Sequence, residues 1–212
     1  MRILATKFLL VLLILGEGTL LCLAQSASTN RHAVYTSPDG SFSFQYPADF
    51  VACRKDHKQP ELWLPTESCA AYVPVCYAST GNPNDVLACV AYPKETMGGT
   101  NLEGAAFSVS RLEESEAECK QFPETPKPDR SPRKVTINHI RYLAIETDGV
   151  AAGSSAESHT YRTFLQNYCY ELSTRISVIN PGGADPGVYK PFDAGKVQKK
   201  LDEALGSFVF RP

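Results

Sequence analysis

The sequence has little net charge, no long apolar run and no recognised catalytic motif. Its 212 residues hold 21 Lys and Arg against 23 Asp and Glu, so no strong field favours nucleic acid or anionic lipid. We find no G-x-S-x-G, no H-E-x-x-H, no P-loop, no Rossmann glycine run and no EF-hand loop. The sequence therefore predicts no catalytic residue, no metal site, no cofactor and no nucleic-acid partner.

The longest apolar stretch lies at the start of the chain. Residues 8–15 (FLLVLLIL) follow Arg2 and Lys7, whereas a membrane-spanning helix needs about 20 such residues. This pattern is typical of a secretory signal peptide over residues 1–24. We therefore expect export to a periplasmic or extracellular compartment and no transmembrane segment. The alternative is a bacterial lipoprotein anchored at Cys22, but Leu21 before it is larger than such signals prefer.

Cysteine is abundant, with seven residues in the chain. One lies in the signal segment, and an even set remains in the mature chain. No C-x-x-C pair is present, and no cysteine is followed by His at zinc-finger spacing, so metal ligation is disfavoured. After an export signal an even number of cysteines predicts disulfides. The cysteines concerned are Cys53, Cys69, Cys76, Cys89, Cys119 and Cys169.

The mature chain has the length of a single domain, predicted over residues 35–212 after a flexible leader over residues 25–34. Alternating apolar residues predict a first strand that ends at Pro47. Asp193 is placed to cap a final helix through Leu205, with the next residue, a glycine, as its stop. The other predicted elements are strands over residues 72–78, 85–92 and 105–112, a helix over 113–122, a proline-rich connector over 123–132, and β-rich runs over 134–147, 159–172 and 173–179.

Strands, a helix, more strands and a last helix, without strict β-α-β alternation, indicate an α+β fold with a mainly antiparallel sheet. Residues 39–50 (DGSFSFQYPADF), the late strands and the ending Ser207-Phe208-Val209-Phe210 resemble PsbP-like domains. The resemblance implies an αβα sandwich used as an accessory or binding module, as in photosystem extrinsic subunits and a nuclear-import cofactor. The cysteines and the proline-rich connector depart from that family's pattern, and a fold alone does not assign a partner.

Residue spacing and the expected packing predict how the cysteines pair. Cys76 and Cys89 would face each other in a hairpin turning at residues 79–84, at a separation that suits a disulfide. A helix packed on the sheet would bring Cys119 to Cys169 and leave Cys53 to pair with Cys69. The rival connectivity joins Cys53 to Cys119 and Cys69 to Cys169.

The leading functional hypothesis is an exported, non-enzymatic module that binds a protein or a cell-envelope component. Its predicted binding surface consists of aromatic side chains that can present one apolar and one polar end. These are Tyr142, Tyr161, Phe164, Tyr168 and Tyr170.

The alternative hypothesis is a secreted enzyme with a dispersed acid/base site. It uses Glu146, Glu157 and His159 around the glycine-rich loop that runs from Gly149 to Ser158. If the hairpin centres near Gly153, then His159 lies opposite Thr147. His139 then lies too far along the ribbon to share a metal with it.

Overall fold

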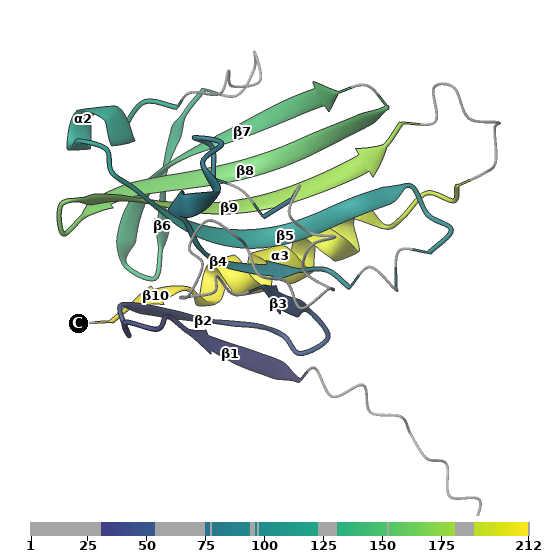
Figure 1. Cartoon of the computed structure of the whole chain (residues 1–212), viewed down its shortest axis with the longest axis horizontal. Coiled ribbons are helices and arrows are strands. Elements are labelled where there is room, and N and C mark those ends of the chain that lie inside the picture. Colours follow the sequence, from purple (N-terminus) through teal and green to yellow (C-terminus); the bar gives the residue numbers. More distant parts are fainter. Residues whose placement is uncertain are drawn as a thin grey trace, which may run out of the picture.

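The computed structural model describes residues 31–53, 75–76, 78–93, 96, 98–122, 131–151, 153–180 and 189–211. Its strands form two sheets whose ladders are all antiparallel (Figure 1). The small sheet has the order β1 (His32–Thr36), β2 (Phe42–Pro47), β10 (Val209–Phe210). The large sheet has the order β3 (Val51–Cys53), β4 (Val86–Ala91), β5 (Leu102–Leu112), β9 (Tyr168–Ile179), β8 (Ser154–Leu165), β7 (Ile140–Ala151), β6 (Arg133–Ile137).

Helix α3 (Ala194–Ser207) packs between the two sheets (Figure 1). The Asp193 side chain caps it by accepting from the Lys196 amide at 2.9 Å, as the sequence predicts. Val197, Leu201 and Leu205 are buried at helical spacing, so one face of α3 closes the core. The predicted α+β fold with a mainly antiparallel sheet is confirmed.

The core is rich in stacked aromatic rings from the small sheet. Phe42 and Phe44 are buried on β2, and the Phe44 ring meets Phe107 of β5 edge-on at 5.1 Å. The ring centre of Phe208, which follows α3, lies 5.4 Å from the ring centre of Phe42. The predicted strand that ends at Pro47 is confirmed as β2, and the C-terminal segment joins it, because β10 pairs with β2.

Helix α2 (Glu116–Cys119) lies on the other face of the large sheet from α3 (Figure 1). Thr174 of β9 accepts a hydrogen bond from Gln198 of α3, whereas Cys169 of the same strand forms a disulfide with Cys119. These two β9 positions differ by an odd number of residues, so their side chains point to opposite faces. Among the described elements, the helices thus cover both faces of the sheet.

Several predicted boundaries are wrong. The helix predicted over residues 113–122 is only the four-residue α2, which Ser115 and Glu118 begin with a reciprocal capping box. Strand β1 starts at His32, inside the predicted leader. The β-rich run over 134–147 is divided into β6 and β7, and the run over 159–172 into β8 and β9, by two-residue turns with positive φ throughout. The turn residues are Asn138, His139, Gln166 and Asn167.

The loop predicted from Gly149 to Ser158 is mostly strand. Gly149 pairs with Ala156, so the ladder between β7 and β8 continues almost to the tip, where Gly153 adopts a φ of 83°. The register also differs by one residue from the prediction: His159 lies opposite Glu146, and Thr147 lies opposite Ser158. A shift of one residue reverses which face each side chain occupies.

Two predicted disulfides are present, Cys76–Cys89 and Cys119–Cys169. The first does not arise from the predicted hairpin, because β4 pairs with β3 and β5, and the described residues Val75 and Cys76 lie outside strands. Cys53 is the register partner of Cys89 in the β3–β4 ladder, yet each of the two is bonded to another cysteine. The predicted partner of Cys53, Cys69, lies outside the described residues.

One buried charge network joins four segments. The Arg162 side chain on β8 is fully buried, and its Nε donates to a Glu171 carboxylate oxygen at 2.8 Å across the β8–β9 ladder. Its terminal nitrogens donate to Glu114 at 3.2 Å, to the Gln121 carbonyl at 2.7 Å and to the Ser79 hydroxyl at 2.6 Å. The Ser79 amide and hydroxyl both donate to Glu171. The guanidinium therefore holds the 79–85 loop and the segment around α2 against the sheet.

The Cys119–Cys169 bridge closes a loop with a sequence separation of 50 residues. In the chain-entropy model, this closure stabilises the fold by about 4 kcal/mol, and the 13-residue Cys76–Cys89 closure by about 3 kcal/mol. We expect Cys119→Ser/Cys169→Ser to lower the urea midpoint more than Cys76→Ser/Cys89→Ser. Thiol titration of each unfolded double variant of the mature chain, which lacks Cys22, should detect no free thiol. A free thiol in either would contradict the pairing.

The buried pair predicts unequal costs for two matched substitutions. Glu171→Gln removes a carboxylate that is 1% exposed and leaves the buried Arg162 guanidinium without the negative charge that pairs with it. This should lower the free energy of unfolding by about 3–5 kcal/mol. Glu114 is 22% exposed, so Glu114→Gln should cost about 1 kcal/mol or less. Urea denaturation of the two variants measures the difference. Equal losses would show that Glu171 has no special place in the network.

The turn between β1 and β2 gives a pH dependence. The Asp39 carboxylate accepts from the Ser41 hydroxyl at 2.7 Å and from the Ser41 amide at 3.0 Å, and these bonds lower the pKa of Asp39 to about 2. Because the pKa of Asp39 is lowered in the folded state, its carboxylate stabilises the fold at any pH above the ordinary pKa of an aspartate. That stabilisation is lost as the pH falls towards about 2. Solvent screening limits it to less than about 1 kcal/mol. Chemical denaturation should show Asp39→Asn less stable at pH 7 and equal to the unsubstituted protein near pH 2.

Candidate functional site

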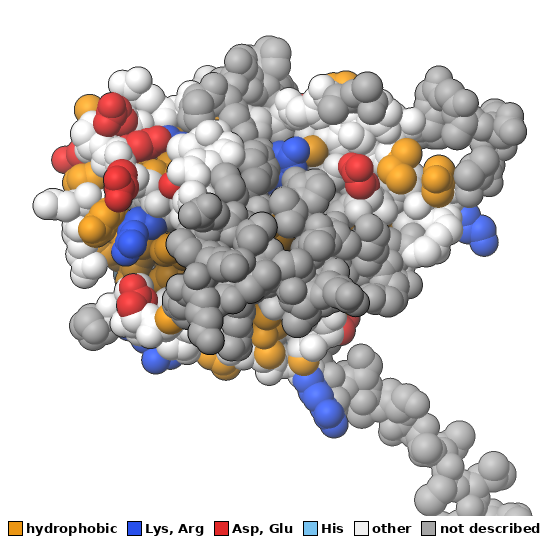
Figure 2. Space-filling model, viewed as in Figure 1, with side chains coloured by type: hydrophobic (Ala, Val, Ile, Leu, Met, Phe, Trp, Pro, Cys, Tyr) orange, Lys and Arg blue, Asp and Glu red, His pale blue; other side chains and the backbone are white. Residues whose placement is uncertain are grey.

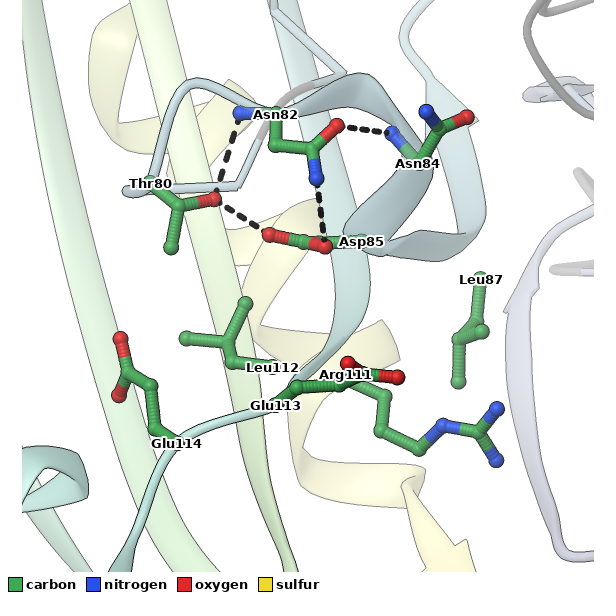
Figure 3. Close-up of a pocket in the computed structure, with 9 residues that line it drawn as sticks. All are labelled: Thr80, Asn82, Asn84, Asp85, Leu87, Arg111, Leu112, Glu113 and Glu114. Carbon is green, nitrogen blue, oxygen red and sulfur yellow. Dashed lines mark hydrogen bonds between the residues drawn. The ribbon is translucent and has the colours of Figure 1, made fainter.

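A pocket of about 450 Å³ opens where β4 and β5 meet the 79–85 loop (Figure 3). We call it the η1 pocket, after the short helix η1 (Pro83–Asp85) on its rim. The loop, the strands and the segment that leads to α2 each contribute side chains to it. The lining residues are Thr80, Asn82, Asn84, Asp85, Leu87, Arg111, Leu112, Glu113 and Glu114.

Hydrogen bonds within the loop fix one side of the η1 pocket (Figure 3). The Thr80 hydroxyl donates to Asp85 at 2.6 Å, and the Asn82 side-chain amide donates to the other Asp85 oxygen at 3.0 Å. The neighbouring Ser79 joins the network of Arg162 and Glu171. The loop is therefore tied both within itself and to the sheet.

The opposite side of the pocket is held by the network and by a disulfide. Glu114 accepts from Arg162, and Leu112 is the register partner of Cys169, which bonds Cys119. Burial raises the pKa of Glu114, and neighbouring carboxylates, Glu171 first, raise it further, while Arg162 opposes this. Three carboxylates face one guanidinium in the lining, so the η1 pocket is acidic. Figure 2 shows Asp and Glu side chains gathered at this end of the molecule, near α2.

An aromatic side chain extends the site beyond the pocket. The Arg111 guanidinium lies 4.6 Å from the centre of the Tyr168 ring, and 37% of Tyr168 is exposed. Stacking on the ring orients Arg111 without neutralising it.

The five aromatic residues predicted as a binding surface do not form one. Tyr142, Tyr161 and Tyr170 are buried, and Phe164 is half-buried. Burial raises the pKa values of Tyr142 and Tyr161. Tyr170 packs edge-on against Phe210 at 4.8 Å, on the face that α3 covers. The aromatic residues that alternate along these strands pack in the core, and of the five only Tyr168 is more than a third exposed.

The structure does bring together the residues of the alternative acid/base site. Glu146, Glu157 and His159 place their ligand atoms within 4.8 Å of one another. His159 Nε2 lies 3.5 Å from a Glu157 oxygen, and Arg133 donates to Glu146 at 3.0 Å. His139 lies in the exposed β6–β7 turn, away from this group, as the sequence predicts.

Sequence reasoning missed the Arg162 network and the η1 pocket. One signal was available: Arg162 and Glu171 are opposite charges equidistant from the Gln166-Asn167 turn, so a tight hairpin would pair them. Ser79 and Glu114 reach Arg162 only through the tertiary fold, so no sequence pattern indicates these contacts. Among the described residues no helix has the length and apolar character to cross a membrane, and Cys22 lies outside those residues.

Comparisons with known proteins give structural neighbours only. No protein-family model matches the chain, and no curated protein matches it. The similar solved structures include a protein from Bacteroides thetaiotaomicron VPI-5482, with 14% identity and a TM-score of 0.43 over 84% of this chain. This chain spans about half of that protein, 48% of its length.

A second similar structure is LpqN of Mycobacterium tuberculosis, described as involved in cell envelope biogenesis, with 9% identity and a TM-score of 0.46. That alignment covers 86% of this chain and 91% of LpqN. A third is the cyanobacterial PsbP (CyanoP) from Synechocystis sp. PCC 6803, with 10% identity, a TM-score of 0.40, and 90% and 99% of the two chains covered. PsbP, whose family the sequence resembles, is thus among the solved structures to which this chain is similar.

Proposed function

We propose that the protein is an exported, non-enzymatic binding module that recognises a protein or a cell-envelope component at the η1 pocket. One observation carries the proposal: both sides of an open, charged pocket are held in place by a buried ion-pair network and a disulfide. Binding costs less free energy when the recognising side chains are ordered beforehand. The secretory pattern of residues 1–24 and the disulfides support export.

The lining indicates the chemistry of the partner. Asp85, Glu113 and Glu114 outnumber Arg111, so the pocket favours a basic group such as a Lys or Arg side chain. Tyr168 beside Arg111 offers a partly exposed ring at the rim, the kind of residue that is enriched in protein interfaces. A basic segment on the surface of a partner protein fits both features.

The acid/base alternative has a less favourable setting. A cavity of about 150 Å³ lies along the same β7–β8 hairpin, and its lining includes Ala156, Arg175 and Ser177. Ala156 alternates with Glu157 along β8, so this cavity lies on the other face of the hairpin from the carboxylate–histidine group. An enzyme site is expected to enclose its acid and base in a pocket with the substrate.

Photo-crosslinking tests the binding proposal. A photoreactive amino acid at position 113 or 168 of the mature protein should capture the same partner from the native exported fraction. The same amino acid at Lys199, exposed on α3, should not. Charge reversal by Glu113→Lys should weaken capture from position 168, because it removes the acidic excess. Equal capture from position 199, or capture indifferent to Glu113→Lys, would contradict recognition at the η1 pocket.

A further inference from the structure

Two neighbouring strands place two carboxylates and an imidazole on one face of the β7–β8 hairpin. Glu146 and His159 are register partners, and Glu157 precedes His159 by two residues on the same strand. Register partners bring their Cβ atoms within about 4.5–5.5 Å, and residues two apart share a face. The backbone of a paired ladder, rather than a loop, therefore fixes where the three side chains begin.

The separations are close to those around a bound metal ion. Two ligands at about 2.0–2.1 Å from a tetrahedral ion lie roughly 3.4 Å apart, and His159 Nε2 lies 3.5 Å from a Glu157 oxygen. The three ligand atoms lie within 4.8 Å of one another, so rotamer adjustments of about 1 Å would complete a tetrahedral set. Among the described residues this is the group of three that meets that distance.

The surroundings concentrate negative charge at this place. Asp148 is the register partner of Glu157, and like charges directly opposite each other destabilise a strand pair. Arg133, whose side chain is 63% exposed, bonds Glu146. The Glu146 side chain is only 13% exposed and Glu157 is 49% exposed, so the group has a buried wall and a side open to solvent. A cation can enter from that open side.

We propose that Glu146, Glu157 and His159 form a binding site for a divalent transition-metal ion, with Zn²⁺ the best match. One imidazole nitrogen and two carboxylate oxygens suit Zn²⁺, which accepts mixed nitrogen and oxygen ligands and leaves a fourth position for water or a ligand. Ca²⁺ needs six to eight oxygen ligands, more than this group offers. The site lies on the hairpin and is independent of the η1 pocket.

The chain supplies a matched control. His32 Nε2 also lies 3.5 Å from a carboxylate oxygen, that of Glu203, so the two repeat the histidine–carboxylate pair, and among the described residues no second carboxylate completes a group of three there. Two such ligands hold Zn²⁺ less well than three. Arg133 supplies a substitution of opposite sign, because the ion must compete with its guanidinium for Glu146.

Titration of the oxidised mature protein with Zn²⁺ by isothermal calorimetry tests the site. Loss of even an outer-shell partner costs roughly 10- to 100-fold in metal affinity, so His159→Asn and Glu157→Gln should each weaken binding at least roughly 10-fold. His32→Asn should leave the affinity unchanged. Arg133→Gln should tighten binding by about 2- to 5-fold, the value of an exposed ion pair.

Two outcomes would overturn the proposal. One is Zn²⁺ binding that His32→Asn reduces as much as His159→Asn does, which would indicate surface histidines acting without a built site. The other is weaker binding in Arg133→Gln. Zn²⁺-dependent shifts of the His159 imidazole signals in NMR spectra of the unsubstituted protein test the same claim without a variant. Their absence at saturating Zn²⁺ would also exclude the site.

Discussion

The buried ion pair between Arg162 and Glu171 is the interaction on which the end of the molecule around α2 and the η1 pocket depends. A fully buried cation is costly unless each of its donors has an acceptor, and here the acceptors are four residues on three segments: β9, the 79–85 loop and the segment around α2. None of these segments can leave without exposing or stranding the charge. The 79–85 loop, the α2 segment and the η1 pocket between them are thus tied to one desolvated side chain, with the Cys119–Cys169 bridge as a second tie.

The two faces of the large sheet have different chemistry, and this explains where the function can lie. The face towards α3 and the small sheet buries rings such as Phe107 and Tyr170. On the other face, small hydroxyl residues are buried beside Arg162 and Glu171; they include Ser108, Ser110, Ser158, Thr160 and Ser173. Hydroxyls can both donate and accept, so this face tolerates a charge network that an apolar face would exclude.

Periodicity and composition predicted those parts of the fold that local chemistry determines. The spacing of Val197, Leu201 and Leu205 after Asp193 specifies α3, and the alternation ending at Pro47 specifies β2. The bond between Cys119 and Cys169 could be predicted because both cysteines face inward from elements expected to pack. The hypothesis of Cys76 with Cys89 reached the right pair through a wrong hairpin.

The remaining errors come from tertiary context. A two-residue turn such as Asn138-His139 carries a weak sequence signal, because neither residue is glycine. A one-residue uncertainty in the β7–β8 register exchanges the faces of Glu146 and Thr147. An alternating strand pattern does not say which face of the sheet is covered, so it does not distinguish aromatic residues of the surface from those of the core. The contacts of the partly buried Ser79 depend on residues far away in the sequence, since Glu171 is separated from it by 92 residues.

The arrangement of Cys53 opposite Cys89 bears on how the chain reaches its native covalent state. In the paired β3–β4 ladder the side chains of Cys53 and Cys89 are neighbours, although each forms its disulfide with a different cysteine. A disulfide between them would be a non-native bond across the ladder, and only attack of a thiolate on that bond would undo it. After such a bond, the native bridges of Cys53 and Cys89 could close only by thiol–disulfide exchange.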